Sequence, residues 1–457
     1  MPRIRLVSAL TATGLALLPS ACGGATRHHP DPARSRPQSV RHQQARSLPQ
    51  QYTDCMRAHG IHDFPEPVDG HISLTPGIDT SSRRFKAAAH ACAKYAPGRS
   101  TTPGAATTPG ATTTNGAATT TASHPWRAYS RWLAARARAG QFSGSVLVAT
   151  PHRTWLDAGF GLSDRSSKAA NTPRTRFCIA SIGKLFTAIS VAQLAERHEL
   201  SFDAPVGRYV RGLPAAIGTH ITIAELLDMT SGLGNVVLGR RRPPTTLAGQ
   251  VALIAGERPQ FTPGRRFLYS NDGYILLGAV VQSVSGESYA RYVGRHVFAP
   301  AHMTHTGYRV YVPADVDGMA HGYALAGTTL RDISEMPQIA NPSGGAYSTT
   351  GDLLRFARAL LAHRLLGAGM TRTILVPRVN SPQPGGPPVD EYTYGFAYQR
   401  IHGVTFVGHN GGTPGYEGQL DVYPRTGRVV VVLTNQDQTM IPAIQRSEAI
   451  ATGEAAS

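Results

Sequence analysis

The chain has 457 residues, 41% of them hydrophobic, which is enough for more than one domain and a sizeable core. It carries 45 basic and 28 acidic residues, a formal net charge of +17. The sequence has no zinc-finger spacing, no basic region followed by heptads and no interleaved aromatic RNA motif, so we expect no nucleic-acid partner. Four of the basic residues are lysines, namely Lys86, Lys94, Lys168 and Lys184, and the remainder are arginines.

Residues 1–22 are predicted to be a signal peptide. Arg3 and Arg5 precede a mainly apolar stretch that ends at Leu18 and is short for a membrane-spanning helix. The stretch LLPSAC resembles a bacterial lipoprotein cleavage box, with Pro19 where such boxes usually carry leucine. This resemblance implies a lipid on Cys22, which would hold the protein at the outer face of the cytoplasmic membrane. The alternatives are secretion without a lipid and retention by an uncleaved anchor.

Two low-complexity segments separate the parts of the chain. Residues 23–49 are polar and rich in arginine and glutamine, which predicts a disordered basic tether. Residues 99–124 consist almost wholly of Thr, Ala, Pro and Gly, which predicts an extended linker. Both segments would place the remaining parts at a distance from the membrane.

Between these segments, residues 50–98 form a small module with two cysteines. An oxidising compartment and the small size of the module favour a disulfide between Cys55 and Cys92. The alternative is a metal site made by Cys55, His59, His90 and Cys92, although this spacing fits no standard zinc pattern. The stretch CMRAHGIHDFPEP resembles a cysteine-pair segment of lipoproteins from high-GC Gram-positive bacteria, and this resemblance implies no particular activity.

Residues 125–445 are predicted to be one globular domain, and residues 446–457 a loose tail. In chain order, the patterns predict a helix that ends at Gly140, two paired strands in 144–161, a helix from Ile221 to Gly232, and a helix that ends at Gly286. Two more strands flank a Pro-Arg-Thr-Gly turn in 418–435. Strands at both ends with helices between them suggest one antiparallel sheet, closed by both ends of the domain, with a helical lobe.

Ser181 and Lys184 lie in the stretch CIASIGKLFTAIS and are the first candidate catalytic residues. In a helix over 181–195, residues three positions apart share a face, and the apolar neighbours predict that this helix is buried. Burial lowers the pKa of a lysine, which can then accept a proton, whereas arginine cannot. A serine needs such a base to become a nucleophile. The Ser-x-x-Lys spacing also occurs by chance, so alone it is weak evidence.

Two further segments strengthen the hypothesis. Tyr269 and Asn271 follow a Pro-Gly turn and directly precede a predicted helix, where side chains can converge on a site. VGHNGGTPG places His409 at the end of an apolar strand, followed by glycines that let a ligand lie against the strand edge. Taken singly, these residues could be a partly buried tyrosine and an incidental histidine in a glycine-rich turn.

In this order, Ser-x-x-Lys, Tyr-x-Asn and His-x-Gly resemble the motifs of the serine β-lactamase and penicillin-binding superfamily, on its class C and DD-peptidase side. The resemblance covers about residues 126–440 and includes the connecting stretches FSGSVLVA, LLDMTSGL and NPSGGAYSTTGDLLRFARALL. It implies an α/β (α+β) fold of the β-lactamase/transpeptidase type, with an antiparallel sheet flanked by helices and an all-helical lobe.

The resemblance also implies roles for particular residues. The catalytic side chains would be the nucleophile Ser181, the proton-shuttle residues Lys184 and Tyr269, the amide-binding Asn271, and His409 in the third motif. The backbone N–H groups of Ser181 and Gly412 would form an oxyanion hole, and Asn410 and Gly411 would belong to the substrate strand. No metal or organic cofactor is implied. Cys178 has no role in the family and is expected to be a small buried residue.

The third motif bears on the substrate. β-Lactamases of this superfamily usually carry a lysine where this chain has His409, and that lysine helps to hold the carboxylate of the ligand. A histidine is only partly charged near neutral pH, so weaker and pH-dependent carboxylate binding is expected. His-x-Gly is more typical of soluble DD-peptidases and D-aminopeptidases.

These observations favour a cell-envelope serine hydrolase that resembles D-alanyl-D-alanine carboxypeptidases and acts on peptidoglycan stem peptides. A carboxylesterase or amidase for small substrates and a β-lactamase are alternatives within the superfamily. A sensor of penicillin or of a wall ligand is the non-enzymatic alternative, and β-lactams would be covalent ligands in several of these cases.

Overall fold

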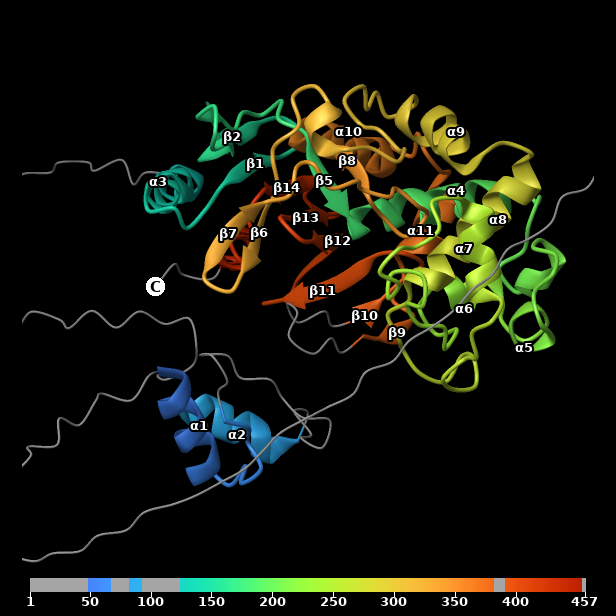
Figure 1. The fold of residues 1–457 in the computed structure, drawn as a ribbon, viewed down its shortest axis with the longest axis horizontal. Helices are drawn as coiled ribbons and strands as arrows, with labels where there is room; N and C mark the ends of the chain where they lie inside the picture. The colour runs from blue at the N-terminus through green and yellow to red at the C-terminus, as the bar shows by residue number, and fades with distance from the viewer. Residues whose placement is uncertain (1–47, 67–81, 93–123, 382–390, 454–457) are drawn as a thin grey trace, which may run out of the picture. The chain divides into compact units, whose positions relative to one another are not determined.

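A computed structural model describes residues 48–66, 82–92, 124–381 and 391–453 (Figure 1). The chain divides into two compact units, residues 1–117 and 118–457. The predicted signal peptide, Cys22 and nearly all of the predicted tether and linker lie outside the described residues. Among the described helices, none combines the length and the apolar character needed to cross a bilayer.

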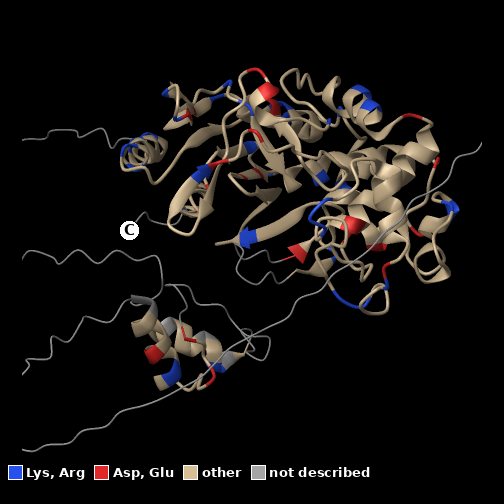
Figure 2. Cartoon of the chain, in the orientation of Figure 1, with Lys and Arg blue, Asp and Glu red and all other residues tan. Residues whose placement is uncertain are grey.

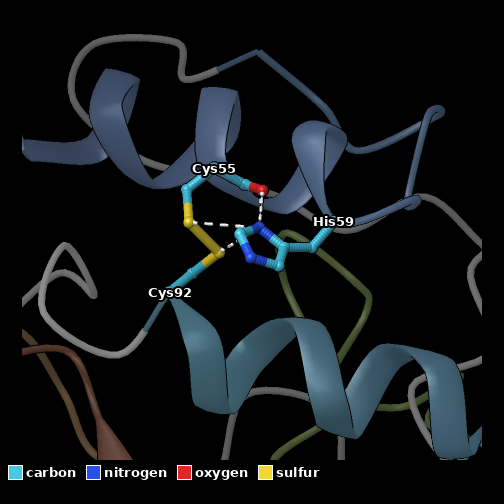
Figure 3. Close-up of a disulfide and its surroundings, with 3 residues drawn as sticks. All are labelled: Cys55, His59 and Cys92. Atoms are coloured by element: carbon cyan, nitrogen blue, oxygen red, sulfur yellow. Dashed lines mark hydrogen bonds between the residues drawn. A yellow bond between two sulfur atoms is a disulfide. The ribbon is translucent and has the colours of Figure 1, made fainter.

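The first unit contains two short helices, α1 (Leu48–Ala58) and α2 (Arg83–Ala91), joined by a disulfide between Cys55 and Cys92. Figure 3 shows the ring of His59 beside both sulfur atoms, and its Nδ1 lies 3.7 Å from each. These three residues are also the ones that could come together around a metal ion. In the disulfide, however, neither sulfur is the thiolate that a metal requires. The side chain of His90, the fourth candidate ligand, lies outside the described residues.

Loss of this disulfide is expected to destabilise the first unit, because its described core is small and, apart from Cys92, fully buries only Met56, Phe64 and Ala88. The double substitution Cys55→Ser and Cys92→Ser should cost about 2–4 kcal/mol of its stability. Limited proteolysis of the full chain would then cut within residues 48–92 faster than in the wild type. Equal cleavage rates would show that other contacts hold the unit together, and an unchanged thermal midpoint of the second unit serves as the internal control.

The second unit is built on an eight-stranded sheet in which every neighbouring pair is antiparallel, in the order β2-β1-β14-β13-β12-β11-β10-β9. Its strands are β1 (Gly144–Ala149), β2 (Thr154–Phe160), β9 (Val379–Asn380), β10 (Glu391–Tyr392), β11 (Ala397–Ile401), β12 (Val404–Thr413), β13 (Tyr416–Tyr423) and β14 (Arg428–Thr434). Pairing of β1 with β14 confirms that strands from both ends of the domain join one sheet.

Both faces of this sheet are covered, which explains the nearly continuous apolar runs in β1 and β14. Side chains alternate between the faces of a strand. Leu147 and Val431 therefore belong to the larger core on one face, and Val146 and Val432 to the smaller core on the other. The smaller core is closed by α3 (Pro125–Arg138) and α12 (Met440–Thr452).

The larger core joins the sheet to a helical lobe, which Figure 1 shows away from α3. Its helices are α4 (Lys184–Glu196), α5 (Ala215–Gly218), α6 (Ile223–Leu227), α7 (Leu247–Ile254), α8 (Asn271–Ser285), α9 (Tyr289–Val293) and α11 (Ala368–Leu375). Helix α10 (Thr350–Leu361) packs against β1 and β14 of the sheet. Three two-stranded sheets complete the unit, made by β3 (Leu162–Asp164) with β4 (Ala169–Ala170), β5 (Phe177–Ala180) with β8 (Ala346–Ser348), and β6 (Tyr323–Ala326) with β7 (Thr329–Asp332).

The helix predicted from Ile221 to Gly232 is too long. The capping box of Thr222 and Glu225 starts α6, but α6 ends at Leu227. Met229 then adopts a positive φ of 65°, a backbone conformation that cannot continue a right-handed helix. The residues that follow form a loop along the candidate site.

The predicted loose tail after residue 445 is also wrong, because α12 continues to Thr452 and Gly453 closes it in a left-handed conformation. The buried face of α12 also carries a carboxyl group. Glu448 of α12 and Asp421 of β13 are buried, with 8% and 1% of their surface exposed. Oδ2 of Asp421 and Oε1 of Glu448 have no hydrogen-bond partner among the described residues. Burial, together with the neighbouring Asp421, raises the pKa of Glu448 to about 8.

Because the folded state holds the proton of Glu448 more tightly than the unfolded state, we expect the free energy of unfolding to fall as the pH rises. The folded state of Glu448 keeps its proton up to about pH 8, whereas the unfolded state releases it near 4.5. The stabilisation is therefore complete below pH 4.5 and is lost towards pH 8. Glu448→Gln should flatten the thermal midpoint against pH and raise it at pH 8. Glu335→Gln, at an exposed position, is the control, and a profile of Glu448→Gln that matches the wild type would contradict this account.

Candidate active site

Ser181 lies at the junction between β5 and α4. The strand ends at Ala180, a 3-10 turn covers Ser181–Gly183, and α4 begins at Lys184. Ala180 has a φ of 42°, a strained conformation for a residue with a side chain, and strain of this kind often marks a functional turn. The turn leaves Ser181 partly exposed, while Lys184 is fully buried at the start of the helix.

Lys184 is held by three oxygen atoms. Its Nζ lies 2.6 Å from Asn271 Oδ1, 2.6 Å from the Ser343 carbonyl and 3.1 Å from Ser181 Oγ. Burial lowers the pKa of Lys184 well below its ordinary value. A neutral amine has two N–H groups and one lone pair. Since the two closer oxygens can only accept, they take both N–H groups, and the lone pair is left for the Ser181 hydroxyl.

Asn271 is oriented by α8 and by the loop after α6. Ser270 caps α8 by accepting a hydrogen bond from the N–H of Gly273 at 2.8 Å, which confirms the predicted junction of loop and helix. Asn235 Oδ1 accepts hydrogen bonds from Asn271 Nδ2 at 2.7 Å and from the Asn271 N–H at 2.9 Å. The Asn271 amide is therefore fixed with its oxygen towards Lys184.

Tyr269 covers the other side of the lysine. Lys184 Nζ lies 4.7 Å from the centre of its ring. Burial raises the pKa of Tyr269, an effect that a hydrogen bond with Ser181 partly opposes. Tyr269 is thus a neutral phenol at physiological pH, next to the hydroxyl of Ser181.

His409 differs from expectation in two respects. It lies in the middle of β12 rather than at a strand end, because the glycines after it continue to pair with β13. It is also buried, with 2% of its surface exposed, and burial lowers its pKa to about 3. Its Nδ1 faces the Asn410 carbonyl and its Nε2 lies 3.1 Å from the Tyr392 hydroxyl. His409 is therefore neutral, and the expected partial charge near pH 7 is wrong.

The loop 341–345 supplies the third contact of the lysine. Asn341 Oδ1 accepts hydrogen bonds from the N–H of Ser343 at 2.9 Å and from its Oγ at 2.7 Å. The N–H of Gly345 donates to the Ala180 carbonyl at 3.2 Å. Gly345 has a φ of 85°, which favours glycine. This tight loop holds the Ser343 carbonyl against Lys184.

These elements enclose a cleft of about 270 Å³ that opens on Ser181. The residues that line it are Cys178, Ala180, Ser181, Leu238, Pro243, Asn271, Pro337, Gln338, Ile339, Asn341, Ser343, Gly344, Gly345, Gly412 and Thr413. None of these described residues has an ionisable carboxyl, amine, guanidinium or imidazole group. The groups that could hold a metal ion, among the described residues, come together only at Cys55, His59 and Cys92 in the first unit.

Comparison with known proteins agrees with this geometry. The Beta-lactamase family model matches residues 130–454, which is more than half of the chain. The chain belongs to the Beta-lactamase family. Penicillin-binding protein 4* of Bacillus subtilis (strain 168) is 27% identical over 321 residues, which cover 65% of this chain and 69% of that protein.

Two solved structures are also similar to this chain. A penicillin-binding protein from Bacillus halodurans is 31% identical, with a TM-score of 0.62 over 70% of this chain and 98% of its own. A D-stereospecific amidohydrolase from Streptomyces sp. is 26% identical, with a TM-score of 0.60 over 72% of this chain and 99% of its own. The predicted fold and superfamily are thus confirmed, and the chain is a penicillin-binding-protein-like serine hydrolase.

The structure brings Ser181, Lys184, Tyr269 and Asn271 together and places the substrate-strand glycines beside them. The sequence patterns did not indicate Asn235 or the Ser343 carbonyl. Each acts through hydrogen bonds with a residue far away in the chain, so no spacing in the sequence reveals it. The resemblance of the stretch NPSGGAYSTT to the Beta-lactamase family was the only available signal for the loop 341–345.

Gly411 and Gly412 of β12 differ sharply in their surroundings. A Cβ on Gly411 would lie 2.9 Å from the Ser181 nitrogen, 3.1 Å from the Ile182 nitrogen and closer still to the Ile179 carbonyl. A Cβ on Gly412 would meet nothing within 4 Å. The close approach at Gly411 thus brings the edge of β12 against the backbone of Ser181.

Gly411→Ala is therefore expected to displace the turn that carries Ser181. Shifts of this size in a catalytic geometry can cost about a hundredfold in rate. We expect a fall of that order in kcat/KM, with a lower thermal midpoint. Gly412→Ala is the matched control, since it adds the same methyl group to open space and should leave the midpoint unchanged. Equal midpoints for the two variants would argue against the close packing of β12 on this turn.

Proposed function

We propose that this protein is a serine acyl hydrolase of the cell envelope that works through an acyl-enzyme on Ser181. The observation that carries the proposal is the hydrogen-bonded contact between Ser181 Oγ and a buried lysine whose two other partners are pure acceptors. This arrangement directs the lone pair of a neutral amine at the hydroxyl, which makes Lys184 a general base.

The proposed reaction has two stages. Ser181 Oγ attacks the carbonyl carbon of the substrate while its proton passes to Lys184 Nζ, and the N–H groups of Ser181 and Gly412 stabilise the negative oxygen that forms. Loss of one such donor typically costs about 3–4 kcal/mol. Tyr269, a neutral phenol, helps to pass the proton to the leaving group. Water then attacks the acyl-enzyme, the carboxylic acid leaves, and the proton returns to Ser181.

For the substrate, we favour peptides that end in D-alanyl-D-alanine, cleaved as by a carboxypeptidase. Support comes from the similarity to penicillin-binding proteins and to a D-stereospecific amidohydrolase. An N-terminal signal peptide with a lipid on Cys22, followed by the tether and linker, would place the second unit where such peptides occur. In this role β-lactams would acylate Ser181.

An esterase or amidase is a second candidate, and one observation favours it. The described lining of the cleft contains no cation, and His409 is neutral and buried. A free carboxylate next to the scissile bond therefore has no charged partner inside the cleft. A substrate whose leaving group is uncharged would avoid the cost of burying an unpaired carboxylate.

Matched substrates can separate these candidates. We would compare diacetyl-L-lysyl-D-alanyl-D-alanine with its C-terminal amide and methyl ester, and follow release of D-alanine or its derivative. Faster cleavage of the free acid would support the carboxypeptidase, and faster cleavage of the amide and ester would support the second candidate. If no substrate is cleaved and penicillin G leaves no adduct on Ser181 by mass spectrometry, the proposed hydrolase function is wrong.

A further inference from the structure

The loop after α6 lines part of the cleft and carries three consecutive arginines. Leu238 and Pro243 line the cleft, and the residues between them include Arg240, Arg241 and Arg242. All three arginines are exposed. None of them forms an ion pair with a described carboxylate. Three neighbouring guanidinium groups repel one another, and a bound anion would relieve that repulsion.

The surrounding segment has the same sign. Residues 235–266 carry six exposed arginines, at positions 240, 241, 242, 258, 265 and 266, and a single acidic residue, Glu257. Burial raises the pKa of Glu257 to about 7, so this carboxyl is only partly charged at neutral pH. Figure 2 shows basic positions on the loops next to α6 and α7. The segment that contributes Leu238 and Pro243 to the cleft is thus strongly basic in sequence.

The loop is held in place rather than loosely attached. The N–H of Gly234 donates to Glu257 Oε1 at 2.5 Å, and the N–H groups of Val236 and Val237 donate to the buried carboxyl group of Asp272. Beyond the arginines, Pro243 and Pro244 restrict the backbone. Fixed ends reduce the conformational entropy that the arginines lose when they bind a ligand.

We propose that Arg240, Arg241 and Arg242 form a rim site for an anionic polymer, rich in phosphate or carboxylate groups, to which the acyl substrate of this hydrolase is attached. The uncharged cleft binds the reacting ester or amide. The three arginines bind the negative charges of the polymer outside the cleft. This inference rests on the proposed function only where it places the reacting group at Ser181. Guanidinium groups bind phosphates and carboxylates through paired hydrogen bonds, which suits either source of charge.

The test is binding of fluorescently labelled polyphosphate and of labelled poly-D-glutamate to the full chain, measured by anisotropy at low and at raised salt. The test variant is Arg240→Gln, Arg241→Gln and Arg242→Gln combined. The control variant removes the same charge elsewhere, by combining Arg174→Gln, Arg211→Gln and Arg364→Gln at exposed positions outside the cleft lining. Thermal midpoints check that both variants are folded.

We expect the wild type and the control variant to bind alike and the loop variant to bind at least about tenfold more weakly, with less dependence on salt. Preference for one polymer would identify the source of the charge. Equal binding by all three proteins, equal weakening in both variants, or no binding by the wild type would overturn the proposal. Bound polymer should also slow hydrolysis of a neutral p-nitrophenyl ester by the wild type. If the polymer leaves this rate unchanged, the arginines do not form a site at the cleft rim.

The ester measurement separates the two proposals. If the wild type cleaves no ester even without polymer, the proposed hydrolase function loses its support. The anisotropy comparison does not depend on turnover and still tests the rim site.

Discussion

Ser181→Ala is expected to lower hydrolysis of every substrate of this protein by at least about a thousandfold, because the change removes the oxygen on which the proposed acyl-enzyme forms. The thermal midpoint should stay close to that of the wild type, since the change removes one partly exposed oxygen from a helical turn. Steady-state rates with an ester and a peptide substrate, together with mass spectrometry after exposure to penicillin G, would measure both turnover and acylation.

The matched control for this variant is Ser283→Ala, at an exposed position on α8, which should keep full activity. Residual turnover of Ser181→Ala within about tenfold of the wild type would mean that Ser181 is not the nucleophile. A penicillin adduct on the Ser181→Ala protein would lead to the same conclusion.

Lys184→Arg is expected to be nearly as damaging, with a loss of at least about a hundredfold in kcat/KM. Arginine keeps the positive charge but does not give up its proton, so it cannot receive one from Ser181. Its larger head group would also have to fit among three oxygen atoms that enclose the amine. For this reason Lys184→Met, which removes the amine at similar size, should be measured beside it.

Lys168→Arg provides the control, because Lys168 is exposed. If Lys184 is the general base for Ser181, both Lys184 variants must lose activity while remaining folded. Normal activity of Lys184→Arg would show that charge alone suffices and that Lys184 is not the base. Activity of Lys184→Met near the wild-type level would exclude the amine from the reaction.

Local patterns in the sequence predicted the strands from both ends of the sheet and the main pair of the site, whereas the fold type came from the resemblance to the superfamily. The alternating faces of β1 and β14 are both buried, and the resulting apolar runs were recognisable as strands. The three-residue spacing of Ser181 and Lys184 fixes their relation within one turn, so their contact follows from helical geometry alone. The junction before α8 likewise follows from Ser270, a residue that favours the cap position.

What could not be predicted depends on contacts between distant parts of the chain. The charge state of His409 is set by its burial beside Tyr392 of β10, and no local pattern indicates that depth. The orientation of Asn271 is set by Asn235, which an exposed loop supplies. Glu448 is buried because α12 packs against β13. The sequence of this segment is polar enough to be read as a loose tail.

The pairing of β1 with β14 has a consequence for how the protein is made. Gly144 lies opposite Thr434, so the two strands in this part of the sheet come from opposite ends of the domain. Contacts over such separations form slowly, because a long loop must close first. The sheet is incomplete until the last strand has been synthesised. The second unit can therefore reach its native fold only after β14 has been synthesised.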